Sequence, residues 1–188
     1  MLEKPHKLWY YSNQKKGKKF MKTLSVVQAA MIASLYVALT LVAAGFDLAS
    51  GAVQVRFSEC LTVLPYYTPA AIPGLIVGCL LANFLTGSIM LDVIFGTLAT
   101  AIGAYASYYV AKSGFPEGRP FLNRLLVSFC PVIANSVIIP FVLTYGYGVP
   151  GGLLMQGISV GIGEVVACVV FGQILLAALH PVRGTLFG

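Results

Sequence analysis

Five ionisable residues stand isolated in long apolar stretches of this chain: Asp47, Arg56, Glu59, Asp92 and Glu164. Burying an ionised side chain in hydrocarbon costs about 2.5 to 3.5 kcal/mol even on the lenient insertion scale. Five such groups facing lipid would cost more than about 10 kcal/mol, so we expect them to face protein, water or a ligand. Together they predict a polar binding site inside an otherwise apolar protein.

The chemistry of these residues favours a cationic or hydrogen-bond-donating solute, because four carboxylates stand against one arginine. Carboxylates accept hydrogen bonds and carboxamides both donate and accept, which suits the edge of a heterocycle. Aromatic side chains such as Tyr66, Tyr67 and Phe84 are candidates to stack on its face. The predicted substrate-binding residues, chosen by type and by depth along the expected helices, are Arg56, Glu59, Asn83, Asp92, Asn135 and Glu164.

Simpler explanations exist for some of these residues. Arg56 and Glu59 have the i, i+3 spacing of a helical ion pair that neutralises itself, and Asp92 could only cap or end a helix. Glu164 is harder to explain in this way, because the chain carries no Lys or Arg between residues 124 and 183. Its partner must come from elsewhere in the fold or from a bound solute, or the carboxyl group must stay protonated.

The composition indicates the environment of this site. The chain has 188 residues, of which 58% are hydrophobic and only 10% charged, whereas soluble domains average roughly 25% charged residues. An integral membrane protein is therefore predicted, and each membrane-spanning helix needs about 20 residues. The expected fold is an all-α bundle of six transmembrane helices with no separate soluble domain.

The apolar pattern predicts helical elements at residues 24–44, 56–68, 70–85, 89–111, 121–143 and 153–179. The second element is too short for a full crossing at about 1.5 Å per residue, and three prolines interrupt its end and the start of the next element. Such an element is tolerated only inside the bundle. Pro131 and Pro140 predict kinks in the fifth element.

The distribution of basic residues predicts the orientation. The formal net charge is +6, and the Lys and Arg residues gather in the amino-terminal tail, the 113–120 loop and the carboxyl end. By the positive-inside rule both termini are cytoplasmic. The expected organisation is a lysine-rich cytoplasmic tail at 1–20, a transmembrane domain at 21–180 and a short cytoplasmic tail at 181–188.

Several classes of function are disfavoured. The basic residues explain orientation better than nucleic-acid binding, for which aromatic residues would be interleaved in a folded basic surface. The four cysteines fall in apolar stretches as small core residues, with no spacing typical of a metal site. No set of nucleophile, base or metal can be assembled, so we expect no catalytic residue, no metal and no cofactor.

Small residues recur four positions apart, as in Ala29 and Ala33, Gly74 and Gly78, Ala99 and Gly103, and Gly157 and Gly161. Such pairs allow helices to approach closely. Packing inside the bundle is the simplest explanation for any one of them.

Three segments carry a resemblance to a known family: VRFSECLTVLPYYTPAAIPG at 55–74, GCLLAN at 78–83 and LDVIFGTLAT at 91–100. They resemble the QueT family, and the resemblance extends over essentially residues 21–179. QueT proteins are substrate-binding S components of energy-coupling factor (ECF) transporters. The resemblance implies uptake of a queuosine precursor, a deazaguanine base, across a bacterial plasma membrane.

The resemblance also implies partners. An S component works with a transmembrane coupling subunit and two cytoplasmic ATPases, and does not hydrolyse ATP itself. The first-helix Ala-x-x-x-Ala motif that docks on the coupling subunit would correspond to Ala29 and Ala33. The alternative from the residues alone is a self-sufficient channel or proton-coupled carrier that titrates Glu164.

Overall fold

The computed structural model describes residues 5–46 and 56–187, with side chains described from Lys22 onward. Every regular element in these ranges is helical, which confirms the all-α prediction. The elements are α1 (Pro5–Gly45), η1 (Phe57–Tyr66), α2 (Ala71–Leu85), α3 (Met90–Ser113), α4 (Pro120–Phe141), η2 (Val142–Gly146), α5 (Gly152–Glu164), η3 (Val165–Phe171), α6 (Gly172–Leu179), η4 (His180–Val182) and α7 (Arg183–Phe187).

Four helical stretches of the described chain are long and apolar enough to cross a membrane: Lys22–Gly45, Met90–Ser113, Pro120–Gly146 and Gly152–Phe187. Helix α2 is apolar but shorter. Large hydrophobic side chains are exposed on all of these helices, far beyond what a soluble monomer presents to water. This is the surface of a multi-pass membrane protein.

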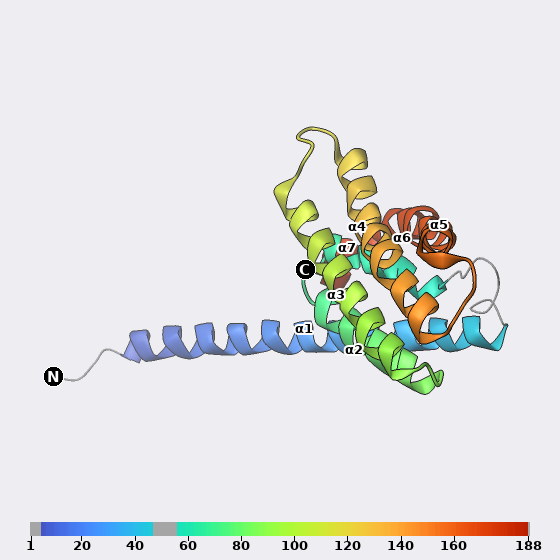
Figure 1. Cartoon of the computed structure of the whole chain (residues 1–188). Helices are drawn as coiled ribbons and strands as arrows, with labels where there is room; N and C mark the ends of the chain where they lie inside the picture. Colours follow the sequence, from blue (N-terminus) through green and yellow to red (C-terminus); the bar gives the residue numbers. More distant parts are fainter. Residues whose placement is uncertain (1–4, 47–55, 188) are drawn as a thin grey trace.

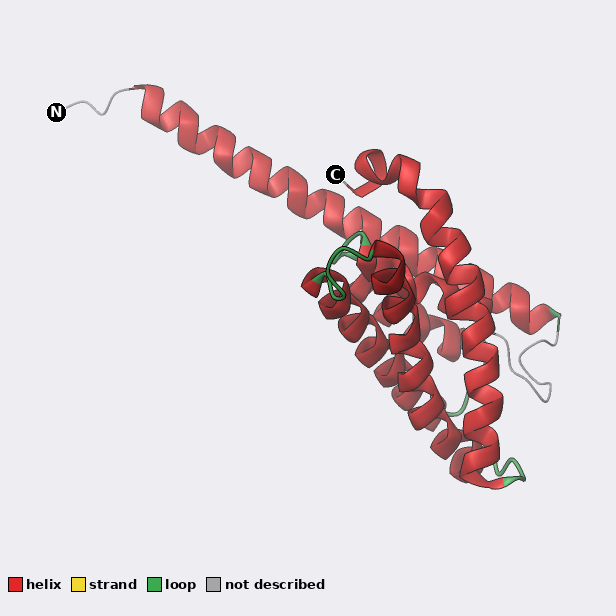
Figure 2. Cartoon of the chain, turned by 90° about the horizontal axis from the view of Figure 1, so that it is seen from above, coloured by secondary structure: helices red, strands yellow, loops and turns green. Residues whose placement is uncertain are grey.

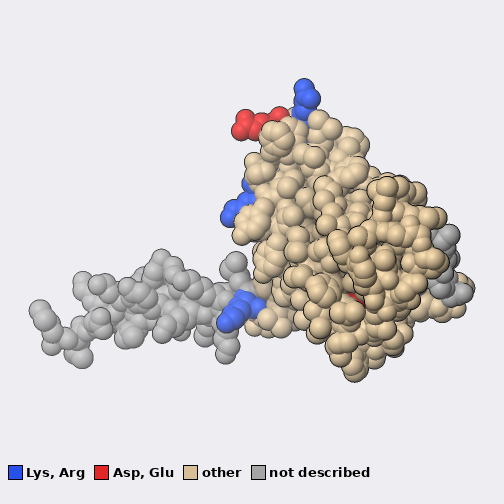
Figure 3. Space-filling model, viewed as in Figure 1, with Lys and Arg blue, Asp and Glu red and all other residues tan. Residues whose placement is uncertain are grey.

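The exposed charges lie at one end of the molecule. Lys22, Lys112, Glu117 and Arg119 are all exposed, and Figure 3 shows blue and red atoms along the left-hand side with an almost uncharged face beside them. In Figures 1 and 2 the amino end of α1, the 114–119 turn and the carboxyl terminus lie toward this side, whereas the 147–151 turn lies toward the opposite side.

Helix α1 is longer than predicted. It begins at Pro5 and continues without a break through most of the lysine-rich segment, whereas the apolar pattern predicted a start near residue 24. Pro5 is tolerated in a first turn, and lysine and glutamine are good helix formers. At the other end of the chain, helical structure continues to Phe187, and Gln28 Nε2 donates to the carbonyl oxygen of Leu186 at 2.7 Å.

The second element is the 3-10 helix η1. Its length and prolines had indicated a short, interrupted element, but not its 3-10 geometry. At about 2.0 Å per residue its ten residues cannot cross a hydrocarbon core of about 30 Å. Seven of them are buried in the protein: Ser58, Glu59, Leu61, Thr62, Val63, Leu64 and Pro65. The element therefore lies inside the bundle, where it places Glu59 in the core.

Glycines let the helices around η1 approach closely. A Cβ atom at Gly74 would lie 2.6 Å from the carbonyl oxygen of Ala29, and one at Gly78 would lie 3.1 Å from Cα of Ala33. A Cβ atom at Gly103 would lie 2.8 Å from Cα of Pro131. In the structure Ala29 and Ala33 thus pack against α2. Packing inside the bundle is the simplest explanation that the sequence offered for this pair.

The last long helix changes its geometry beside Glu164. Helix α5 ends at this residue and continues into the π-helical segment η3 before α6. The predicted 153–179 helix is therefore correct in extent but not uniform. Wide π turns within α-helices are frequent at functional sites. Helix α4 stays α-helical through Pro131 and Pro140, and its π turn η2 follows at Val142.

Candidate functional site

The predicted site residues converge on one polar centre formed by η1, α2, α3, α4 and α5. Five of them are 1–5% exposed, namely Glu59, Asp92, Asn135, Asn83 and Glu164. The side chain of Arg56, which precedes η1, is 23% exposed. The fifth isolated charge of the sequence, Asp47, lies outside the described residues.

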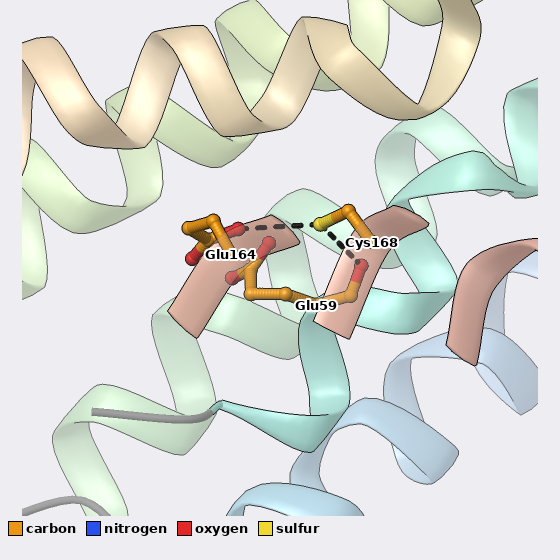
Figure 4. A group of neighbouring side chains, drawn as sticks. All are labelled: Glu59, Glu164 and Cys168. Carbon is orange, nitrogen blue, oxygen red and sulfur yellow. Dashed lines mark hydrogen bonds between the residues drawn. The ribbon is translucent and has the colours of Figure 1, made fainter. Parts of the chain in front are cut away.

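Two carboxyl groups meet at the core of this centre. Figure 4 shows Glu59 from η1 beside Glu164 and Cys168 from the last long helix, and one ligand atom of each lies within 4.8 Å of the others. The Cys168 thiol lies 3.2 Å from Glu164 Oε2 and 3.3 Å from the backbone oxygen of Glu59. The Tyr36 hydroxyl donates to Glu59 Oε1.

Several polar atoms at this centre have no hydrogen-bond partner among the described residues. They include Glu59 Oε2 and Asn135 Nδ2, both fully buried. Buried polar atoms in proteins are nearly always satisfied, so such atoms indicate a strained or ligand-binding place. One atom can accept and the other can donate a hydrogen bond, which matches a ligand that has both kinds of group.

A small cavity lies next to these atoms, lined by Arg56, Asn135, Ile139, Val160 and Glu164. Its volume is about 10 Å³, which is room for a single water molecule. Ligand pockets of proteins usually measure roughly 300 to 1,000 Å³. The cavity in this structure therefore holds no more than about one water molecule, and a ligand the size of a base would not fit it unless the surrounding helices separated.

A second group of residues holds Asp92 at the edge of the centre. The Arg56 guanidinium pairs with Asp92 Oδ2 at 3.3 Å, and the Tyr147 hydroxyl donates to the same oxygen at 3.1 Å. Asn83 Nδ2 lies 3.4 Å from the backbone oxygen of Asp92. Because Arg56 also lines the cavity, it connects this group, named the Arg56–Asp92–Tyr147 clamp below, to the carboxyl pair.

The simpler explanations for these residues are wrong. In the described part of the chain Arg56 forms its ion pair with Asp92 rather than with Glu59. Asp92 lies in the first turn of α3, but its carboxylate binds Arg56 and Tyr147 instead of capping the helix. Packing across the bundle overrides the i, i+3 spacing here.

The expected stacking residues do not line the cavity. Phe84 is 68% exposed on the outer surface, and the Tyr67 hydroxyl donates to the carbonyl oxygen of Leu176 at 2.8 Å. Tyr66 ends η1 and Tyr67 follows it, whereas Glu59 lies in its first turn, so most of the element separates the two tyrosines from the carboxyl pair.

Comparisons with known proteins add the family. The QueT transporter family model matches residues 26–181. This chain belongs to the QueT transporter family. A curated relative, the queuosine precursor transporter QueT of Lactococcus lactis subsp. cremoris (strain MG1363), is 35% identical over 81 residues, which are 43% of this chain and 47% of the relative. The alignment thus spans about half the length of that relative. No solved structure matches the chain.

Some residues of this QueT-family site were not predicted from the sequence. Tyr36 and Tyr147 supply hydroxyl groups to Glu59 and Asp92; Tyr147 lies near a predicted helix end, where a tyrosine is typically an interfacial anchor. A Cβ atom at Gly96 would lie 3.0 Å from Asn83 Nδ2 and 3.1 Å from Asp92 Oδ1. Gly96 lies four residues after Asp92 and so on the same face of the helix, and this spacing could have identified it as a residue of the site.

Breaking the clamp is expected to destabilise this QueT-family protein. Asp92→Asn keeps the shape of the side chain but leaves Arg56 without its counter-charge, which we expect to cost about 1 to 3 kcal/mol because the pair is only partly buried. The measurement is the apparent melting temperature of the detergent-purified protein. Glu117→Gln, at an exposed loop carboxylate, is the matched control. Equal melting temperatures for the two variants would contradict the clamp.

Proposed function

We propose that this chain is the substrate-binding S component of an ECF-type importer for a queuosine precursor, a deazaguanine base. The observation that carries the proposal is the buried polar centre, in which Glu59 Oε2 and Asn135 Nδ2 have no partner among the described residues. Membership of the QueT transporter family and the name of the Lactococcus relative support the substrate class.

The chemistry of the centre fits such a base. A deazaguanine presents ring and amino N–H donors together with a carbonyl acceptor on one edge. The carboxylates of Glu59 and Glu164 can accept N–H donors of the base or of its substituent, and the Asn135 amide can donate to the carbonyl. A site that satisfies buried polar groups only when the correct ligand is bound discriminates strongly against analogues that lack those groups.

The proposed orientation follows from the exposed charges. Lys22, Lys112, Arg119 and Arg183 are exposed, and we place them at the cytoplasmic face, with both termini inside and six helical segments in the membrane. The clamp then lies toward the outer face of a bacterial plasma membrane. Opening the clamp would admit the base from outside.

Transport in this proposal needs no catalytic residue in the chain. A transmembrane coupling subunit and two cytoplasmic ATPases would supply the driving force, and the chain would only bind and release its substrate. The rival arrangement, a self-sufficient proton-coupled carrier, predicts uptake into vesicles that contain this chain alone.

Binding tests the proposal. Calorimetric titration of the purified protein with queuine and with aminomethyl-deazaguanine should show binding of at least one of them, and none of thiamine. Glu164→Gln should weaken that binding at least about tenfold, because it removes a buried acceptor of the ligand's hydrogens. Glu117→Gln, in the exposed loop, should bind like the parent protein. No binding by protein shown to be folded, or unchanged binding by Glu164→Gln, would contradict the proposed site.

Coupling to the ECF module is proposed through α1, where the family motif would place Ala29 and Ala33. In this structure Ala33 is buried, and its Cα lies close to the Gly78 backbone position on α2. Docking of a partner at Ala33 would therefore require α2 to move away from α1. Ala30, three residues before Ala33, is exposed and offers a control of the same type on the same helix.

Substitution at these alanines separates the two roles. We expect Ala33→Leu to lower both the melting temperature and ligand binding, because overpacking of the α1 and α2 contact costs about 1 to 3 kcal/mol and displaces Tyr36, the partner of Glu59. Ala30→Leu should leave both quantities unchanged. Retained binding in Ala33→Leu would contradict the packing role of Ala33, and retained binding together with lost uptake in cells would assign Ala33 to docking alone.

A further inference from the structure

The buried charges of the polar centre do not balance. The four ionisable groups that face one another there are Arg56, Glu59, Asp92 and Glu164. Arg56 forms its ion pair with Asp92 at 3.3 Å, and Tyr147 donates to the same carboxylate. Within the described residues, no Lys or Arg nitrogen forms an ion pair with Glu59 or Glu164. Two buried carboxyl groups, close enough to share one ligand, are thus left without a cation.

The neutral donors around this pair satisfy only part of it. Tyr36 donates to Glu59 Oε1, and the Cys168 thiol, a weak donor, reaches Glu164 Oε2 at 3.2 Å. Glu59 Oε2 has no partner among the described residues. Asn135, 3% exposed, lines the adjoining cavity beside both carboxyl groups, and its Nδ2 group makes no hydrogen bond of ordinary geometry. The Asn135 amide on α4 is thus a second observation, separate from the two carboxyl groups, that supports a ligand site at this place.

We propose that Glu59 and Glu164 together bind a primary ammonium group of the substrate, so that the protein selects a cationic deazaguanine over a neutral one. This inference rests on the proposed function and specifies which substituent of the base the carboxyl pair recognises. An ammonium group has three N–H donors, which suit Glu59 Oε2 and the Glu164 carboxylate from two different elements. Its single positive charge offsets one of the two carboxylate charges.

A divalent metal ion is the less favoured occupant. Glu59, Glu164 and Cys168 could each offer one ligand atom, but the Cys168 thiol is engaged with the Glu164 carboxylate and the Glu59 backbone. Binding a metal through this sulfur requires the thiolate. The guanidinium of Arg56 also lines the same cavity. A singly charged hydrogen-bond donor needs no change at Cys168.

The test compares two ligands with one ring system. Aminomethyl-deazaguanine carries the ammonium group, and cyano-deazaguanine carries a neutral nitrile in its place. Dissociation constants for both are measured by calorimetry in detergent, with EDTA present, for the parent protein and for Glu59→Gln, Glu164→Gln and the control Glu117→Gln. Size-exclusion profiles and melting temperatures establish that each variant is folded.

The parent protein and Glu117→Gln should bind the aminomethyl ligand at least about tenfold more tightly than the cyano ligand. Glu59→Gln and Glu164→Gln should each bring the ratio of the two dissociation constants toward one, mainly by weakening the binding of the aminomethyl ligand. This result would support the inference.

Three results would overturn it. Equal binding of the two ligands by the parent protein removes the selectivity, whatever the variants do. An equal loss of both ligands in Glu59→Gln and Glu164→Gln would mean that the carboxyl groups hold the ring edge, which leaves the proposed function intact. Binding of neither ligand by the folded parent protein would remove the proposed function as well.

Discussion

The burial of Glu59 and Glu164 side by side in an apolar bundle is the constraint on which the other features depend. Two carboxyl groups in such a place are costly unless donors or a cation reach them. A short 3-10 helix carries Glu59 into the core, a π turn begins next to Glu164, and Tyr36 reaches across from α1 to donate to Glu59. The departures from regular α-helix at η1 and η3 thus lie beside the carboxyl pair.

The small cavity and the clamp connect binding to movement. Arg56 lines the cavity and also holds Asp92, which in turn binds Tyr147 beyond α4. A ligand that enters the cavity must displace this arrangement or work around Arg56, since the space present accommodates about one water. Binding and opening of the edge nearest the 147–151 turn are therefore expected to be linked through one side chain.

Sequence reasoning found the helical class, the buried short element and the residues of the polar centre, because isolated charges in apolar stretches have few places to go. It could not find which groups pair. The Arg56–Asp92 contact joins residues from two elements, and nothing in their spacing of 36 positions indicates it. Tyr147 and Cys168 looked like an interfacial anchor and a core residue, since a side chain's hydrogen-bond partner depends on packing. The predicted 24–44 span matches the apolar part of α1, Lys22–Gly45, but apolar content gave no indication that the helix begins at Pro5.

The most direct test of the central claim is an experimental structure of the protein with aminomethyl-deazaguanine bound. The account predicts ligand density between η1, α4 and α5, with the ammonium group within hydrogen-bond distance of Glu59 and Glu164. It also predicts a cavity larger than the one seen in this structure. Ligand density on the outer surface near Phe84, or in a place without contact to either carboxyl group, would contradict it.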